Sequence, residues 1–195
     1  GVVRVYSYNG TSWVQRGSAL GISGQGNAIH RVSISGTGDV LAIGAGSNST
    51  YVYKWNGSSW VQRASLTGSG NYGGAISLNS DGSILGVGSS GLNSNKGAVN
   101  IYAWNGSVYN LVDQMIEGEA SGDLFGGYIS LSNDGGTLAV GGIENDGGGN
   151  NSGHVRLYKI NTSSTTLAVG GVVTYTASFN INQQAVDSGS VNNSA

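Results

Sequence analysis

The chain has 195 residues, of which only 9% are charged, against about 25% in a typical soluble domain. It contains 36 glycines, no proline and no cysteine, and its formal net charge is −2. These values exclude disulfides, thiolate metal sites and nucleic-acid binding through a basic surface. No apolar run approaches the roughly 20 residues of a membrane helix, so we expect neither a nucleic-acid partner nor membrane insertion. Abundant glycine without proline, together with regular Val, Ile, Leu and Tyr, predicts a turn-rich all-β protein.

The first predicted element is a hairpin at residues 5–13, where an aromatic-rich run, an Asn-Gly pair and a second aromatic run follow one another. Near-copies stand at residues 52–60 and 101–109, and a fourth start at 155–160 lacks the Asn-Gly pair. Glycine adopts a positive φ at no steric cost and asparagine tolerates it, so each Asn-Gly pair predicts a tight primed turn.

A second hairpin, with Asp or Asn and Gly at its turn, alternates with the first. Its three copies are residues 33–44, 77–88 and 130–141. Equivalent tyrosines of the first hairpin are spaced 47, 49 and 56 residues apart, which is close to the period of four-stranded propeller blades. We therefore predict three four-stranded propeller-like blades in residues 1–160, open or completed by neighbours. The repeats have the bounds 2–50, 51–97 and 98–153, with a partial copy at 154–160.

The aromatic residues of the first hairpin recur in two columns. These are Tyr8, Trp55 and Trp104 in one column, and Trp13, Trp60 and Tyr109 in the other. Such recurrence is expected if stacked sheets bury the same position in each copy. A platform on which sugar rings stack is the alternative role. Strand alternation further predicts one face with Val3 and Val5 and an opposite face with Arg4, Tyr6 and Tyr8.

Residues 124–142, followed by 153–158, resemble the FG-GAP type of β-propeller repeat found in extracellular and surface proteins. The resemblance covers the whole predicted repeat region, and Leu124-Phe125-Gly126-Gly127 belongs to its best copy. The first repeat departs from the pattern with Ala28-Ile29-His30, and the second has Tyr72-Gly73. The resemblance implies a propeller fold and an extracellular or cell-surface location.

Integrin-like members of that family carry an Asp-x-Asp-x-Asp-Gly calcium loop. The nearest stretch here is residues 144–150, where Glu144 and Asp146 are the candidate calcium ligands. The stretch has only these two carboxylates and no terminal bidentate acid, so a solvated loop is the competing interpretation. Apart from this calcium candidate, we expect no cofactor and no metal.

Residues 161–195 differ in character and resemble the C-terminal half of the Ig-like repeats of large bacterial surface proteins. Within residues 173–179, apolar residues alternate with Thr and Ser, which predicts a strand with one apolar face that must pack against a partner. The residues of this expected assembly strand are Val173, Tyr175, Ala177 and Phe179.

Enzymatic chemistry finds little support in the sequence. The only histidines, His30 and His154, form no paired zinc motif, and there is no phosphate loop or nucleophile elbow. An acidic run offers a carboxylate pair for glycoside hydrolysis, but it lies on a Gly-containing connection of one repeat, which favours a solvated loop. That run consists of Asp113, Glu117, Glu119 and Asp123. We predict that the protein is not an enzyme.

Asn-x-Ser/Thr sequons make N-glycosylation a candidate modification. Three of them coincide with the Asn-Gly turns, where turn chemistry alone explains the asparagine. The candidate sites are Asn9, Asn48, Asn56, Asn105, Asn150, Asn161 and Asn192.

Charge is divided between two parts of the repeat region. Residues 1–64 have five basic residues against one acidic residue, a net charge of +4, and residues 65–153 have one basic against eight acidic, a net charge of −7. Ends of opposite sign suit head-to-tail stacking, and such a contact generates a fibre when it does not close. A solvated charge gradient is the competing interpretation.

We therefore predict a non-catalytic extracellular structural protein, a self-assembling fibre or surface-layer subunit joined by strand exchange and head-to-tail stacking, with a second copy as its partner. The alternative is an excerpt of a large cell-surface adhesin whose propeller binds a glycan or a protein ligand. The chain opens on Gly1-Val2-Val3 within a strand pattern, so we expect a processed product or an excerpt of a longer chain.

Overall fold

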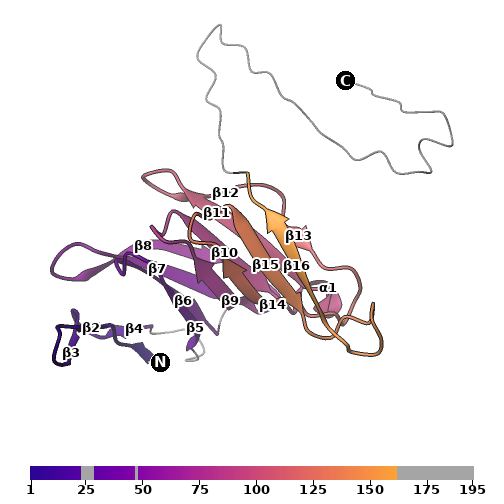
Figure 1. The fold of residues 1–195 in the computed structure, drawn as a ribbon, viewed down its shortest axis with the longest axis horizontal. Coiled ribbons are helices and arrows are strands. Elements are labelled where there is room, and N and C mark those ends of the chain that lie inside the picture. The colour runs from indigo at the N-terminus through magenta and orange to yellow at the C-terminus, as the bar shows by residue number, and fades with distance from the viewer. Residues whose placement is uncertain (23–28, 47, 162–195) are drawn as a thin grey trace, which may run out of the picture. The chain divides into compact units, whose positions relative to one another are not determined.

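A computed structural model describes residues 1–22, 29–46 and 48–161, which form a series of antiparallel sheets (Figure 1). The expected assembly strand within residues 173–179 and the sequon at Asn192 lie outside these residues. The described residues belong to one compact unit, Gly1–Thr162. Among them, no helix has the length and apolar character needed to cross a membrane.

Two sheets in the middle of the series have four strands that follow one another in chain order. The first sheet consists of β5 (Ile29–Ile34), β6 (Val40–Ala45), β7 (Ser49–Trp55) and β8 (Trp60–Thr67). The second sheet consists of β9 (Tyr72–Leu78), β10 (Ile84–Ser89), β11 (Ala98–Trp104) and β12 (Tyr109–Leu111), and β13 (Ile116–Glu117) also pairs with β11. A single helical turn, α1 (Leu92–Asn95), lies between β10 and β11.

Smaller sheets stand at the two ends of the series. The third sheet has the strands β14 (Phe125–Leu131), β15 (Thr137–Gly142) and β16 (His154–Lys159). At the N-terminus, β1 (Val2–Val3) pairs with β4 (Leu20–Gly21), and β2 (Tyr6–Tyr8) pairs with β3 (Trp13–Gln15). We call these four short strands the half-sheet. Its strands β2 and β3 are a copy of the Asn-Gly hairpin, and another copy forms β7 and β8, the last two strands of the first sheet.

The all-β prediction is confirmed, whereas the expected division into three four-stranded blades needs a correction. The described residues form sheets of four, five and three strands and two two-stranded sheets. Each sequence repeat begins with the Asn-Gly hairpin, but each sheet begins with the second hairpin. A sheet therefore joins the second hairpin of one repeat to the Asn-Gly hairpin of the next, which leaves the first such hairpin in the half-sheet.

Hydrophobic clusters lie between consecutive sheets and hold the series together. Strands β6 and β10 are buried along their whole length, because neighbours cover both faces, and both therefore read as continuous apolar runs. The alternation predicted at the N-terminus is also confirmed: Val3 and Val5 pack in a cluster, while Tyr6 and Tyr8 are exposed. Fully buried members of the three clusters include Ile43, Val52, Leu85, Val99 and Leu138.

Backbones of consecutive sheets touch at pairs of glycines. A Cβ on Gly44 of β6 would lie 2.0 Å from the carbonyl oxygen of Gly73 in β9, and a Cβ on Gly88 of β10 would lie 2.0 Å from that of Gly126 in β14. Gly73 and Gly126 have φ angles of 82° and 81°, in the left-handed region that strains other residues. Only glycine fits on both sides of each contact, so these pairs fix the distance between neighbouring sheets.

Hydrogen bonds between sheets accompany this close approach. The backbone N–H of Leu78 donates to Ser33 Oγ, and that of Leu131 donates to Ser77 Oγ, both at 3.0 Å. The turns of the second hairpin are linked in the same direction, from Thr37 N to Ser80 O and from Ser80 N to Asn133 O, both at 2.9 Å. The glycine contact and these hydrogen bonds between the first and second sheets thus recur between the second and third.

The tight primed turn predicted for the Asn-Gly pairs is wrong. Four residues, Asn56 to Ser59, connect the paired Trp55 and Trp60. Asn56 Oδ1 accepts hydrogen bonds from the backbone N–H groups of Ser58 and Ser59 at 2.9 and 2.8 Å. A type I′ turn needs positive φ at both central residues, but of the pair only the glycine, with φ of 103°, has it. The asparagine therefore caps a longer loop.

We predict that Gly44→Ala lowers the free energy of unfolding by at least about 2 kcal/mol, because the new Cβ collides with a backbone carbonyl. Gly141 occupies the equivalent position in β15, where the nearest atom to an added Cβ is 3.5 Å away. Gly141→Ala should therefore change the unfolding free energy by less than about 0.5 kcal/mol. Urea unfolding followed by circular dichroism measures both variants, and equal losses would contradict the spacing role of Gly44.

Aspartates at the second hairpin predict sensitivity to acid. Hydrogen bonds from Lys54 and Thr37 hold the pKa of Asp39 below its ordinary value, and hydrogen bonds from Ser83 do the same for the pKa of Asp81. A carboxyl group whose pKa is lowered by folding stabilises the protein above its unfolded pKa and loses that contribution as pH falls through its folded pKa.

We expect the unfolding free energy to stay constant between about pH 7 and about pH 5 and to fall below about pH 4. Urea unfolding at a series of pH values measures this, and Asp81→Asn should make the fall shallower. Stability that rises on acidification below about pH 4 would contradict the lowered pKa values.

Candidate functional site

The recurring aromatic residues form pairs across the hairpins. Ring centroids lie 5.5 Å apart in the pairs Tyr8–Trp13 and Trp55–Trp60 and 5.1 Å apart in Trp104–Tyr109. The partners stand directly opposite each other on neighbouring strands, where such pairs stabilise a hairpin. Trp60 and Tyr109 are buried, which agrees with a packing role, whereas Trp13 of the half-sheet is 70% exposed.

An arginine from the preceding sheet lies over the aromatic pairs of the first and second sheets. The guanidinium carbon of Arg63, in β8, is 3.7 Å from the ring centroid of Trp104 and 5.2 Å from that of Tyr109. Arg16 stands 4.7 and 5.6 Å from the two rings of the first sheet's pair. Burial lowers the pKa of Arg63 from its ordinary value, yet an arginine stays charged. A cation over a ring face contributes about 0.5–2 kcal/mol.

Arg16 and Arg63 were missed in the interpretation of the sequence, although a signal for them exists. Each ends an identical tetrapeptide, Trp13-Val14-Gln15-Arg16 or Trp60-Val61-Gln62-Arg63. The first and fourth residues of such a strand point to opposite faces. Trp60 therefore packs towards the half-sheet, where its Nε1 donates to the carbonyl oxygen of Arg16 at 2.9 Å, while Arg63 reaches the second sheet.

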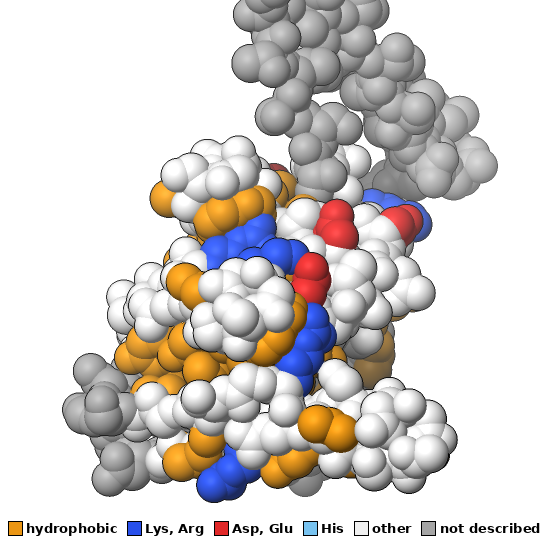
Figure 2. Space-filling view, turned by 90° about the vertical axis from the view of Figure 1, so that its left-hand side faces the viewer, with side chains coloured by type: hydrophobic (Ala, Val, Ile, Leu, Met, Phe, Trp, Pro, Cys, Tyr) orange, Lys and Arg blue, Asp and Glu red, His pale blue; other side chains and the backbone are white. Residues whose placement is uncertain are grey.

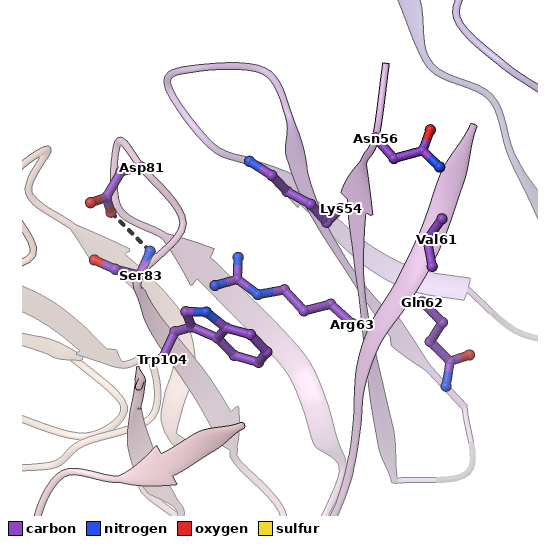
Figure 3. Close-up of a pocket in the computed structure, with 8 residues that line it drawn as sticks. All are labelled: Lys54, Asn56, Val61, Gln62, Arg63, Asp81, Ser83 and Trp104. Atoms are coloured by element: carbon purple, nitrogen blue, oxygen red, sulfur yellow. Dashed lines mark hydrogen bonds between the residues drawn. The ribbon is translucent and has the colours of Figure 1, made fainter. Parts of the chain in front are cut away.

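Arg63 lines a groove of about 550 Å³ between the first and second sheets. Figure 3 shows its side chain extending towards the indole ring of Trp104, with Lys54 of β7 and Asp81 of the turn between β9 and β10 nearby. Figure 2 looks onto the end of the sheets where the Asn-Gly hairpins protrude, and basic side chains lie there among hydrophobic ones. The groove is lined by Lys54, Asn56, Val61, Gln62, Arg63, Asp81, Ser83 and Trp104.

The groove offers charge and hydrogen bonds rather than a bare aromatic platform. A sugar ring that stacks on the arginine-covered face of Trp104 must displace the guanidinium group of Arg63. Lys54 is engaged in an ion pair with Asp39, and Asp81 Oδ1 accepts the backbone N–H of Ser83 at 2.8 Å. This chemistry suits the polar edge of a glycan or of a peptide better than a stacked ring.

The carboxylates of the acidic run are engaged in hydrogen bonds and ion pairs. Asn145 Nδ2 donates to Asp123 at 2.7 Å and to Glu119 at 3.1 Å. Arg156 forms an ion pair with Glu119 and lowers the pKa of that carboxyl group. The other two carboxylates have the contacts Glu117 with Lys96 Nζ at 2.8 Å and Asp113 with Gln114 N at 2.7 Å. Glu119 and Asp123 thus hold the connection before the third sheet to that sheet, whereas Glu117 and Asp113 have their partners within the second sheet and its connections.

The calcium candidate gains no support in the described part of the chain, which contains no group of three or more His, Asp and Glu residues able to hold a metal ion. Glu144 and Asp146 are exposed. Asp146 accepts a hydrogen bond from the backbone N–H of Asn151 at 2.8 Å and so shapes its own loop. His154 lies in β16 with its ring 6.2 Å from that of Phe125.

The six candidate glycosylation sites within the described residues lie in loops and turns. The side-chain oxygens of Asn9, Asn56 and Asn105 accept the backbone N–H groups that shape their hairpin loops. Asn48 has a φ of 58°, and its side-chain oxygen accepts the backbone N–H of Tyr72 at 3.0 Å. The remaining described sites, Asn150 and Asn161, are exposed. Turn formation explains four of these asparagines, and glycosylation itself stays a prediction.

Antiparallel sheets with strands in chain order, packed face to face and joined from the last strand of one to the first strand of the next, define a β-propeller-like protein. Among solved structures, the chain is similar to Sqt1 of Saccharomyces cerevisiae, with a TM-score of 0.48 and 17% sequence identity. The match covers 69% of this chain and 32% of Sqt1, so the chain spans about a third of that structure. At this identity the likeness concerns the fold alone.

No protein-family model matches the sequence, and no curated protein matches it. The FG-GAP and Ig-like resemblances therefore stay predictions. The expected extracellular or cell-surface location finds no support and is not retained. A likeness that concerns the fold alone assigns no other compartment, and the function proposed below depends on none.

The junction between the second and third sheets replaces both members of the arginine-aromatic contact. Val112 stands at the position of Arg16 and Arg63, and Ile160 stands at the position of Trp55 and Trp104. Both replacements pack in the apolar cluster between the second and third sheets. The chain therefore contains a polar and an apolar version of one inter-sheet contact.

We predict that Arg63→Val and Trp104→Ile each lower the free energy of unfolding by about 1 to 2 kcal/mol. The double variant should lose about 1 kcal/mol less than the sum, because it reproduces the apolar pair found between the second and third sheets. Arg63→Met is the matched control that keeps an aliphatic stem without the charge. Urea unfolding of all four variants closes the cycle, and additive losses would contradict a direct contact.

Proposed function

We propose that the protein is a non-catalytic structural module of the β-propeller-like class that associates head to tail with further copies of itself. The observation that carries this proposal is the pair of unlike, open ends of the described series of sheets. The half-sheet exposes Tyr8 and Trp13, and the third sheet exposes Val155 and Leu157. Stacked repeats stabilise one another through nearest neighbours, so uncovered apolar end faces favour a further neighbour.

The charge distribution supports a polar, head-to-tail contact. Residues 1–64 carry a net charge of +4, and residues 65–153 carry −7. Opposite charges favour the encounter of unlike ends and oppose that of like ends. A contact between unlike ends is heterologous, and it generates a filament when the rotation between copies does not close a ring.

We expect the sedimentation coefficient of the purified protein to increase with protein concentration. In negative-stain electron microscopy, the protein should form filaments of constant width. Deleting residues 165–195 should abolish assembly while circular dichroism still reports folded sheets, because the deletion removes the predicted assembly strand. Compact particles of 19.7 kDa at every concentration would overturn the proposed function. Filaments that persist after the deletion would exclude residues 173–179 from the interface and leave self-association standing.

A second candidate function is a binding module for a glycan or a protein ligand. The groove around Arg63 and Trp104 favours it, because it combines an indole ring with charged and amide groups. Glycan-array binding that is lost in Trp104→Ala, and retained in Val108→Ala on the neighbouring loop, would favour this function over a purely structural one.

A further inference from the structure

One apolar contact recurs at the junctions between sheets. In the cluster between the half-sheet and the first sheet, Val5 packs together with Trp55 and Trp60. In the cluster between the first and second sheets, Val52 packs together with Trp104 and Tyr109. The third strand of one sheet thus presents aliphatic side chains to the aromatic pair of the next sheet. Figure 1 shows the sheets following one another in this order.

Both partners of this contact are uncovered at the ends of the described series. Leu157 of β16 pairs with Ala139, as Val52 pairs with Ala42 in the first sheet, so Leu157 holds the aliphatic position of the third sheet. Leu157 and its neighbour on the same face, Val155, are each 73% exposed. At the other end, the aromatic pair Tyr8 and Trp13 is 57% and 70% exposed.

We infer that a second copy of this chain docks its half-sheet on the outer face of the third sheet, with Tyr8 and Trp13 against Val155 and Leu157. The inference rests on the proposed function and names the two surfaces that meet. An aliphatic residue at the strand position of Leu157 and an aromatic pair at the positions of Tyr8 and Trp13 already pack against each other at the junctions within the chain. Like ends offer no such match, since they set aromatic pair against aromatic pair or aliphatic strand against aliphatic strand.

Charge around the two surfaces fits this occupant. Arg4 alternates with Val3 and Val5 and therefore lies on the aromatic face of the half-sheet. Beside Val155, a hollow of about 470 Å³ is bordered by residues at both ends of the loop that carries the exposed acids Glu144 and Asp146. Lys159, which shares the exposed face of β16 with Val155 and Leu157, donates from its Nζ to Thr137 Oγ1 at 2.9 Å. The opposite charges of Arg4 on one copy and of the acidic loop on the other favour the unlike pairing.

The test uses two full-length double variants that each disable one surface. Val155→Lys with Leu157→Lys disables the tail, and Tyr8→Ser with Trp13→Ser disables the head. All four side chains are mostly exposed, so the fold is expected to persist, and circular dichroism checks this. Val108→Lys is the matched control, because Val108 is 51% exposed on a hairpin loop away from both surfaces.

We expect the sedimentation coefficients of the wild type and of Val108→Lys to increase with protein concentration. Each double variant alone should lose at least about a hundredfold in association constant, since two apolar side chains no longer become buried. An equimolar mixture of the two variants should form a dimer and nothing larger, because only one intact head can meet one intact tail.

Each other outcome has a distinct meaning. A wild type that stays monomeric overturns the proposed function, and this inference falls with it. Double variants that assemble like the wild type overturn this inference alone, since association then uses another surface. A mixture that yields no dimer overturns the head-to-tail pairing. If the lysine variant fails to fold, Val155→Ser with Leu157→Ser replaces it in the same mixture with the same expected dimer.

Discussion

The spacing between sheets depends on backbone contact at the glycine pairs Gly44 with Gly73 and Gly88 with Gly126. Facing sheets normally stand about 10 Å apart because side chains separate them. Where neither strand carries a Cβ, the backbones meet, and hydrogen bonds such as that from Leu78 N to Ser33 Oγ come within reach. The first sheet has a bulge without a glycine pair at this position. In the described residues its neighbour, the half-sheet, has no inner strand to approach it, so no glycine is required there.

Towards the outer strands of the sheets, the two side chains that meet at a junction differ together from one junction to the next. Arg63 lies over Trp104 between the first and second sheets, and Val112 packs in one cluster with Ile160 between the second and third. A lone arginine facing isoleucine would bury a charge without a partner, and a lone valine facing tryptophan would leave a void. The two residues that face each other at a junction therefore have to match in polarity and size. Because the pair involves only adjacent sheets, every junction is specified almost independently of the others, as in other repeat proteins.

The sequence predicted those parts of this fold that local chemistry determines. Strand alternation at Val3 and Val5, the two kinds of hairpin and the all-β class all follow from neighbours within a few residues. The offset between repeats and sheets does not follow from such local chemistry. It is set by pairing such as Val40 with Lys54, which joins the second hairpin to the following Asn-Gly hairpin. The sequence of the connection between them is equally compatible with two hairpins that do not pair. The loop at Asn56 was misjudged because its length depends on where the last ladder pair forms. The role of Arg63 was missed because its partner belongs to another repeat.

The head-to-tail junction differs from the interior junctions in one respect that bears on its strength. An interior junction combines the glycine contact, the serine hydrogen bond and the aliphatic-aromatic contact over whole sheets. The incoming half-sheet has only outer strands, so it reproduces the aliphatic-aromatic contact and leaves the surface around Gly141 and Tyr128 uncovered. Such a junction buries less apolar area than an interior one and is therefore weaker. Assembly through this contact is then reversible and governed by concentration, while the sheets within each copy stay folded.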